Sequence, residues 1–381
     1  MERFGKILEG RHEYAKAWKA RTGGRVFGYY EPYMPEEIVY AAGILPVRVL
    51  ARHEPDDLTD RQMYGNCYCT KDMLCQFLRG RYDYVDGIVN SEGCQWMYHA
   101  YQTTLANFPE MFNHYVFVPD YPNARTSKGV LRSELQVFKA HIEEWSGREI
   151  TEAALDHAIE VYNTNRRLMR RIYELRKADY PVLRGSEVME MILCSQIMDK
   201  EEMNKMLLEV IVQLEEREPL PDGVRLMLIG SETFDAELEK MLESLGANVV
   251  VDELENGSAY IWNEIILQKD RLMSIALRYL ERPHSAIKDN NWRRRPEHIF
   301  QLCEDFQADG AIIAKQIYCH PHGTDNYMVW KLLRERGIPF HYFERDTTLP
   351  PEETRLHLEA FLDTVKPGIN RIVGLNQPAR I

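Results

Sequence analysis

The chain has 381 residues, of which 45% are hydrophobic and 28% are charged, and its formal net charge is −12. This length and composition suit a folded globular protein of two or three domains with a substantial core. The acidic balance argues against a nucleic-acid-binding protein, since phosphate backbones require a basic surface. The sequence starts without the apolar core of a secretory signal and has no window of roughly 18 apolar residues. We therefore expect a cytoplasmic protein without membrane spans.

Residues 1–125 are predicted to form a first α/β lobe. A helix begins after Pro35, where two glutamates suit the positive end of the helix dipole, and another runs over 71–78 and ends before Gly80. Strands that alternate with helices indicate a parallel sheet with covered faces. The expected strands span 25–30, 45–50, 84–90 and 116–120.

Residues 126–218 are predicted to be helical. An apolar stripe at helical spacing ends at Gly147, a residue that suits a helix C-cap. Thr151 is the expected N-cap of a long helix that ends before Pro181, and two more helices follow. The segment 217–223, with two prolines and a glycine, is the clearest linker in the chain.

Residues 219–381 are predicted to form a second α/β lobe. Helices are expected at 236–247 and 351–365. The sequence therefore predicts two Rossmann-like parallel-sheet lobes joined by a helical middle segment, with the functional site in the cleft between the lobes. The expected strands of the second lobe span 224–230, 248–253, 310–317 and 339–344.

The seven cysteines are an odd number for a reducing compartment, which indicates metal binding or burial rather than disulfides. Three of them lie in helical apolar patterns, and we expect these in the core, where free cysteine behaves as a small hydrophobic residue. The predicted core cysteines are Cys75, Cys194 and Cys303.

The two lobes share one local pattern. Asp86-Gly87 precedes an apolar strand and then Cys94, and Asp309-Gly310 precedes another strand and then Cys319. Because ligands bind beyond the carboxyl ends of strands in open α/β sheets, we expect both thiols on one cleft. Cys67 follows a Gly-Asn turn at the start of a helix, where backbone N–H groups favour a thiolate.

Three thiolates from distant positions suggest a soft metal ion or an iron–sulfur cluster. Structural zinc usually takes four ligands in close pairs, and the single residue between Cys67 and Cys69 is too short a spacer for that pattern. Simple burial of the thiols is the alternative, and spacing alone leaves both open.

Three blocks in order along the chain carry a resemblance to a known family. They are Pro35-x-Glu37 with AAGILPV at 41–47; Cys67, GRYDYVDG at 80–87 and Cys94; and Asp309-Gly310, Cys319-His-Pro-His322 and Asp325. With these blocks nearly the whole chain resembles the 2-hydroxyacyl-CoA dehydratase superfamily, which includes the subunits of ATP-dependent benzoyl-CoA reductase. GRYDYVDG and the RTGGRV opening look most like the smaller cluster-carrying subunit of such class I reductases.

The resemblance implies one four-iron four-sulfur cluster per chain, held by Cys67, Cys94 and Cys319, with Cys69 as the one acceptable replacement for Cys67. It implies an oxidoreductase subunit that helps reduce an aromatic acyl-CoA, most plainly benzoyl-CoA, to a cyclic dienoyl-CoA in anaerobic aromatic degradation. It also implies a homologous second cluster-binding subunit. A separate ATPase activator with a bridging four-iron four-sulfur cluster, supplied by ferredoxin, would deliver the electrons.

The substrate stays open on the sequence. Dehydratase subunits of the family usually have Asp after the second cysteine, whereas Gln95 follows Cys94 here. A radical 2-hydroxyacyl-CoA dehydratase is one alternative, and a non-catalytic scaffold that only relays electrons is another. A double-cubane cluster is disfavoured, because 281–291 lacks the further cysteines of those relatives.

Glu37, just past the carboxyl end of the first strand, and His322 are the candidate catalytic residues. Glu37 would contact the cluster or donate a proton; the alternative is a carboxylate that stabilises the start of a helix. His322, three residues after Cys319, would donate a proton or support the cluster sulfurs; the alternative is a turn residue.

Three further features bear on ligands and partners. The run Arg293-Arg294-Arg295 is expected at the surface, with a coenzyme A phosphate as the alternative. Gly230-Ser231 lacks the glycine-rich run and the lysine of a P-loop, so we expect no ATP hydrolysis on this chain. The aromatic stretch 95–109 either contacts the homologous subunit or covers the first sheet.

Overall fold

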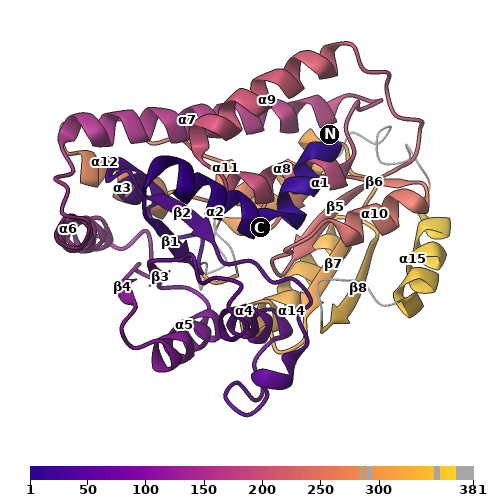
Figure 1. The fold of residues 1–381 in the computed structure, drawn as a ribbon. Coiled ribbons are helices and arrows are strands. Elements are labelled where there is room, and N and C mark those ends of the chain that lie inside the picture. Colours follow the sequence, from indigo (N-terminus) through magenta and orange to yellow (C-terminus); the bar gives the residue numbers. More distant parts are fainter. Residues whose placement is uncertain (284–285, 289–293, 347–351, 366–381) are drawn as a thin grey trace.

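The structure is a computed structural model that describes residues 1–283, 286–288, 294–346 and 352–365. Within these residues the strands form two four-stranded sheets, and the strands of each sheet are parallel. The first sheet has the order β2-β1-β3-β4, and the second has the order β6-β5-β7-β8 (Figure 1). The predicted α/β fold with two parallel-sheet lobes is confirmed.

The strands are β1 (Val26–Tyr29), β2 (Leu45–Arg48), β3 (Gly87–Ser91), β4 (Phe112–Val116), β5 (Val224–Gly230), β6 (Ala247–Glu253), β7 (Gly310–Gln316) and β8 (Phe340–Arg345). The helices up to residue 215 are α1 (Glu2–Glu9), α2 (Arg11–Thr22), α3 (Glu36–Ala41), α4 (Tyr68–Leu78), α5 (Gln95–Asn107), α6 (Ser127–Ser146), α7 (Glu152–Glu174), α8 (Gly185–Ser195) and α9 (Lys200–Glu215). The later helices are α10 (Glu237–Ser244), α11 (Ser258–Ile261), α12 (Arg271–Leu280), α13 (Arg295–Asp305), α14 (His320–Glu335) and α15 (Glu352–Thr364).

Several element boundaries follow from single residues, as predicted. Thr151 caps α7, because its hydroxyl accepts a hydrogen bond from the Ala154 N–H at 3.1 Å. Gly147 ends α6 in the left-handed region, with φ +69°. β5 matches its predicted span, since all seven of its residues are buried, as expected for a strand covered on both faces.

The position predicted for β4 is wrong. The sequence predicts a strand over 116–120, but β4 spans Phe112–Val116. β4 is an edge strand of its sheet, so only part of it is buried, and the exposed Asn113 hides the strand pattern in the sequence. The apolar residues after β4 belong to a loop, in which Val118 is buried.

The Asp-Gly pair before β3 and before β7 has the same structural role in both lobes. The Asp86 carboxylate accepts a hydrogen bond from the Val26 N–H at 2.8 Å, and the Asp86 N–H donates to the Val26 carbonyl at 2.9 Å. Asp309 makes the same two bonds with Arg225, at 3.0 and 2.7 Å. Each aspartate therefore fixes the start of the neighbouring central strand.

The glycine of the first pair is required by close packing, which gives a stability test. A Cβ atom at Gly87 would lie 2.8 Å from the Phe112 carbonyl oxygen. We expect Gly87→Ala to lower the free energy of unfolding by about 1–3 kcal/mol, because the backbone of β4 must move. Gly129→Ala, at an exposed position of α6 where a Cβ meets no atom within 4 Å, is the control and should be neutral or stabilising by up to about 1 kcal/mol. Urea midpoints measure both, and equal midpoints would contradict the packing argument.

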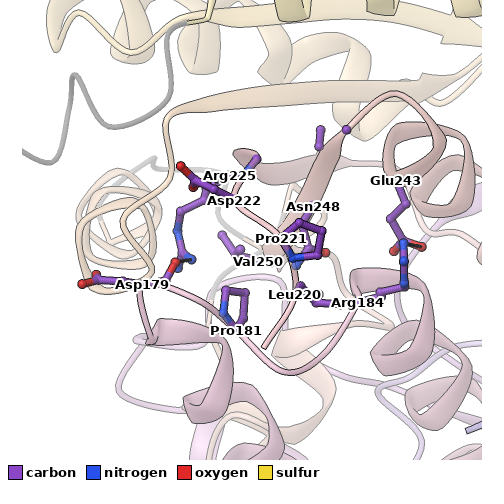
Figure 2. A pocket seen from close by; sticks show the side chains of 13 residues that line it. Asp179, Pro181, Arg184, Leu220, Pro221, Asp222, Arg225, Glu243, Asn248 and Val250 are labelled. Carbon is purple, nitrogen blue, oxygen red and sulfur yellow. Dashed lines mark hydrogen bonds and ion pairs between the residues drawn. The ribbon is translucent and has the colours of Figure 1, made fainter. Parts of the chain in front are cut away.

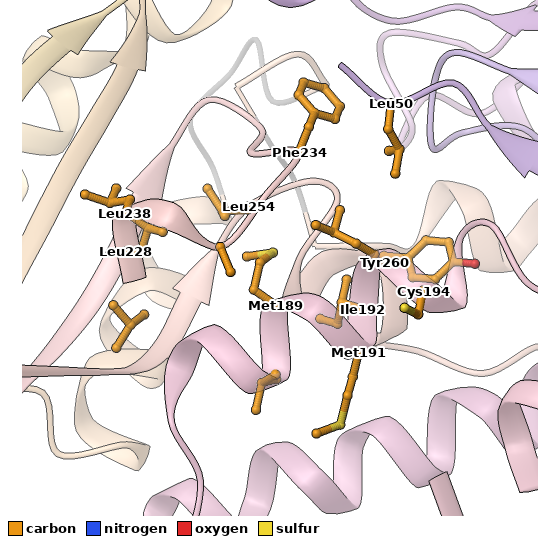
Figure 3. Close-up of a cluster of buried hydrophobic side chains, with 14 of the residues drawn as sticks. Leu50, Met189, Met191, Ile192, Cys194, Leu228, Phe234, Leu238, Leu254 and Tyr260 are labelled. Atoms are coloured by element: carbon orange, nitrogen blue, oxygen red, sulfur yellow. The ribbon is translucent and has the colours of Figure 1, made fainter. Parts of the chain in front are cut away.

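The larger of the hydrophobic clusters among the described residues contains side chains from both lobes. Leu50 from the first lobe, Met189 from α8, and Leu228 and Leu254 from the second lobe all belong to it (Figure 3). The helical segment therefore contributes α8 to the packing between the lobes. The cysteines predicted to lie in the core are buried: Cys75, Cys194 and Cys303.

Two adjacent glutamates at the start of α3 are buried in ion pairs with the helical segment. Glu37 pairs with Arg166 of α7, and its other carboxylate oxygen accepts a hydrogen bond from the Tyr279 hydroxyl at 3.2 Å. Glu36 lies 3.6 Å from the Nζ of Lys200 in α9. These pairs join the first lobe to the helices that cross the top of Figure 1.

Removing one partner of the buried Glu37–Arg166 pair should lower the stability of the fold. We expect Arg166→Met to lower the free energy of unfolding by about 3–5 kcal/mol, because Glu37 is left as a buried charge without its main partner. Arg171→Met on the same helix breaks an exposed pair with Glu215 at 3.4 Å and should cost below about 1 kcal/mol. Urea midpoints followed by circular dichroism compare the two variants. Equal losses would show that the buried pair has no special weight.

The predicted boundaries at 125/126 and 218/219 fall between β4 and α6 and between α9 and β5. They stay predictions, because α1 and α12, outside the middle segment, pack against α8 and α6 inside it. In the described part of the chain, no helix has the length and apolar character needed to cross a bilayer.

Candidate functional site

Cys67, Cys94 and Cys319 lie at the amino ends of three helices. They are the N-cap residues of α4, α5 and α14, respectively. Cys94 follows β3 and Cys319 follows β7, which hold corresponding places in the two sheets. The structure brings all three cysteines to the lining of one pocket between the lobes, where the carboxyl ends of parallel strands place a ligand site.

The pocket has polar groups set in an apolar wall. Met97, Phe234 and Ile287 form part of the wall, and the space enclosed is about 50 Å³. Both lobes contribute, so the pocket exists only when the lobes are correctly placed. Its polar lining residues other than cysteine are Glu31, Ser231, Glu232, Glu255, Gln316 and His322.

Burial raises the pKa of all three thiols. The pKa of Cys94 lies well above its usual value, because Glu31 and the other two thiols add to the effect of burial. Burial raises the pKa of Cys319 to about 11. In each case a backbone amide three residues on, at Thr70, Met97 or His322, acts in the opposite direction. The bare thiols are therefore neutral near pH 7, and a positively charged metal centre would favour their ionisation.

Cys69 lines the same pocket but has different neighbours. After burial, the largest influences on the pKa of Cys69 come from Cys67 and Arg345. Cys67, in contrast, is among the main groups that raise the pKa of both Cys94 and Cys319. These neighbours favour Cys67 over Cys69 as the third thiol of the set.

His322 also lines the pocket. It is buried in the first turn of α14, and burial, with Arg295 and Lys315 nearby, lowers its pKa to about 3. The imidazole is therefore neutral near pH 7 and has one N–H to donate.

Glu37 does not line this pocket. Burial alone would raise the pKa of its carboxyl, but Arg166 and Arg278 outweigh that effect and hold the pKa below its usual value. The carboxylate is therefore ionised, and its observed contacts are those of an ion pair between α3 and α7. Its role at a cluster or as a proton donor stays a prediction.

Glu31 is a pocket residue that the sequence motifs did not single out. It lies just beyond the carboxyl end of β1, and its Oε1 accepts a hydrogen bond from the Cys94 N–H at 2.8 Å. Burial raises its pKa well above the usual value, and Glu232 and Glu255 add to the shift, so the protonated form is favoured. The signal was available, since Glu31 directly follows the strand predicted at 25–30.

Two contacts join the lobes next to the pocket. Arg48 at the end of β2 donates hydrogen bonds to both carboxylate oxygens of Glu232, each at 2.7 Å. The Trp96 indole N–H donates to the Tyr318 carbonyl at 2.8 Å. Tyr318, directly before Cys319, is a non-glycine residue in the left-handed region, with φ +65°. Residues this far apart in sequence give no pattern from which the pairs can be predicted.

The donor set is compatible with an iron–sulfur cluster. Cys67, Cys94 and Cys319 line one pocket and cap three different helices, which suits a centre in which each thiolate binds its own metal atom. Among the described residues, no group of three or more His, Cys, Asp or Glu side chains is arranged to hold a metal ion.

A wider cleft of about 450 Å³ adjoins the cysteine pocket. The two share Cys94, Trp96, Ile287 and Pro321 in their linings, so the cleft is the natural approach to the pocket. The Asp and Glu residues that line the cleft are Glu92, Asp120 and Asp325.

The surface position predicted for Arg295 is wrong. Arg295 is buried at the start of α13, with ion pairs to Glu253, at 2.8 Å, and to Asp325. Both carboxylates pair with the Arg295 guanidinium. These contacts therefore give no support to a role of Arg295 in binding a coenzyme A phosphate. Arg294 is exposed, and Arg293 lies outside the described residues.

Another cavity, of about 130 Å³, lies at the amino ends of β5 and β6 in the second sheet, away from the cysteine pocket at the carboxyl ends (Figure 2). The predicted linker borders it, with the Leu220 N–H bound to the Pro181 carbonyl at 2.8 Å. Arg225 donates to the carbonyls of Arg176 and Phe306 at 2.8 and 2.7 Å. These contacts anchor the linker and the helical segment to β5.

Comparison with known families now identifies the class of protein. The sequence model described as 2-hydroxyglutaryl-CoA dehydratase, D-component, matches residues 32–365, a range that contains all three cysteines. The chain therefore belongs to this family, and the resemblance drawn from the three sequence blocks is confirmed.

The relatives of the chain include subunits of dehydratases and a subunit of a reductase. The chain is 26% identical to the beta subunit of (R)-phenyllactyl-CoA dehydratase from Clostridium sporogenes, over 95% of this chain and 97% of the relative. It is 25% identical to one of the subunits of benzoyl-CoA reductase from Thauera aromatica, over 92% and 94%. It is 23% identical to the beta subunit of (R)-2-hydroxyglutaryl-CoA dehydratase from Acidaminococcus fermentans, over 89% and 91%. The relatives are thus named as subunits of enzymes that act on acyl-CoA thioesters.

Proposed function

We propose that this chain is the cluster-binding subunit of an enzyme that acts on an acyl-CoA thioester. Cys67, Cys94 and Cys319 hold one four-iron four-sulfur cluster. The observation that carries the proposal is the position of these cysteines, which come from both lobes, cap three helices and line one pocket between the lobes. Positive helix ends favour thiolates, and two sheets that end at the same pocket bring them together.

The cluster would supply low-potential single electrons, and the chain's own residues supply orientation and a dry environment. Three cysteine ligands would leave one iron of such a cluster without a protein thiolate. His322 offers a neutral N–H and Glu31 a carboxyl group beside the thiols. Both are positioned to bind or protonate an oxygen or carbon of a thioester in the pocket.

The reaction is the ATP-coupled reduction of an aromatic acyl-CoA to a cyclic dienoyl-CoA. The similarity to the benzoyl-CoA reductase of Thauera aromatica and the segments GRYDYVDG at 80–87 and RTGGRV at 21–26 support it. Dehydration of a 2-hydroxyacyl-CoA is the second candidate, because the similarity to a phenyllactyl-CoA dehydratase is equally strong. In a third case, the chain only relays electrons to a partner that binds the substrate.

The chain works with other proteins in this proposal. Two electrons are needed for ring reduction, so the supply is completed by a homologous second cluster-binding subunit. A separate ATPase activator with a bridging cluster, fed by ferredoxin, delivers the electrons. Helix α5 is the candidate contact: Met97 and Tyr101 are buried, whereas Tyr98 is 42% exposed. The inward face of α5 covers the first sheet, and its outward face is the side that would meet the partner.

The ligand set predicts a pattern of iron loss. We expect the full-length chain, reconstituted anaerobically, to bind about four irons and four sulfides per chain. Cys67→Ala, Cys94→Ala and Cys319→Ala should each lose most of this iron. Cys69→Ala tests the neighbouring thiol, and Cys303→Ala in the core is the matched control; both should retain it. A tightly bound zinc ion, or loss of iron in Cys69→Ala but not in Cys67→Ala, would contradict the assignment.

Substrate assays separate the candidate reactions. The chain is expressed anaerobically with its homologous partner and activator, then given ATP, a reductant and either benzoyl-CoA or a 2-hydroxyacyl-CoA. Mass spectrometry of the thioesters should show a mass gain of two hydrogens from the first substrate. Loss of water from the second substrate without reduction of the first would establish the dehydratase instead.

A further inference from the structure

Glu31 brings a carboxyl group to the cysteine pocket from the first lobe. It lies just past the carboxyl end of β1, lines the pocket, and is 1% exposed. β1 pairs with β3, so the turns that follow these two strands lie side by side, and the second of them carries Cys94. A thiol and a carboxyl group therefore reach the pocket from neighbouring strand ends.

The Cys94 turn holds one oxygen of this carboxyl group. Oε1 of Glu31 accepts a hydrogen bond from the Cys94 N–H at 2.8 Å. Gly93 permits the close approach, because a Cβ atom there would lie 2.7 Å from the carboxyl carbon of Glu31. Within the described part of the chain, the bond from Cys94 is the only hydrogen bond that the Glu31 side chain makes. Oε2 is therefore available to a ligand in the pocket.

The other glutamates that line the pocket are bound by side chains. Glu232 follows β5, whose place in the second sheet matches that of β1 in the first, and Arg48 donates to both of its oxygens at 2.7 Å. Glu255 accepts a hydrogen bond from the Tyr33 hydroxyl at 3.4 Å. Glu31 is thus the pocket carboxyl group that other side chains leave available.

We propose that Glu31 is the fourth protein ligand of the cluster and binds the iron that the three cysteines leave without a thiolate. This inference rests on the proposed function and adds a ligand to the same site. Carboxylate oxygens are common ligands of protein-bound iron, and they are harder than thiolate sulfur. In the binding step a lone pair of Oε2 forms the bond to iron, the carboxyl proton leaves, and no electron is transferred. A carboxylate held at this iron exchanges with a substrate oxygen, which returns Glu31 to the role proposed above.

The test is mild oxidation of the anaerobically reconstituted full-length chain. Ferricyanide takes an electron from the cluster, and an iron without a protein ligand is then released first, which gives a new electron paramagnetic resonance signal. At a dose that leaves the natural chain intact, we expect Glu31→Gln to lose about one iron per cluster. The glutamine keeps an oxygen for the Cys94 N–H, so this loss cannot come from a missing hydrogen bond. Glu255→Gln, at another carboxyl group of the pocket, is the matched control and should keep its iron.

The outcomes separate this role from the proposed function. A natural chain that binds no iron and sulfide would defeat the proposed function before any oxidation. A natural chain that loads its cluster but loses iron as readily as Glu31→Gln would overturn the role of Glu31 alone. Equal loss from Glu255→Gln would do the same. So would protection that His322→Ala loses and Glu31→Gln keeps, because the imidazole would then be the ligand.

A second variant covers a failure of the first. Glu31→Ala removes the carboxyl group altogether and replaces the glutamine variant if that variant does not fold, as judged by circular dichroism. If both variants fold but neither binds iron, the carboxyl group acts on assembly of the site, and the proposal of a fourth ligand fails.

Discussion

The relative placement of the two lobes depends on buried ion pairs between segments far apart in the sequence. Glu37 pairs with Arg166 of the helical segment, and Arg48 of the first lobe pairs with Glu232 of the second. A buried ion that loses its partner costs several kcal/mol, so each pair is satisfied only over a narrow range of lobe positions. Because the thiols sit on helices fixed to the lobes, the same pairs determine how the thiols face one another.

The two lobes line the pocket with equivalent strand ends, but the side chains next to these strand ends differ. Asp86 and Asp309 fix the starts of the central strands in the same way, and the strands that follow end at Cys94 and Cys319. The neighbours of these strand ends differ between the lobes: Glu31 accepts the Cys94 N–H, whereas Glu232 pairs with Arg48. Equivalent strand ends therefore present thiols to a common pocket, and unequal neighbours give each thiol its own environment.

The sequence predicts what depends on local pattern and misses what depends on lobe placement. β5 is predicted within its observed bounds because a strand buried on both faces is apolar throughout, whereas the edge strand β4 is misplaced because Asn113 faces solvent. Cys94 and Cys319 are singled out by their positions after strands, and Glu31 obeys the same rule. Arg295 is misassigned because its partner Glu253 lies on a strand 42 positions away, and only the fold brings them together.

The charges around the pocket explain why the site suits a metal centre rather than free thiolates. Burial, Glu31 and the other two thiols raise the pKa of the Cys94 thiol, and Glu232 and Glu255 also line the pocket. Arg48 balances Glu232, and Glu31 is driven toward its neutral form. These neighbours therefore reduce the negative charge in the pocket, and the cysteine thiols stay protonated when no metal is bound. A cationic centre would reverse that balance, because it would supply the positive charge that three thiolates in this pocket need. Proton release and metal binding would therefore occur together.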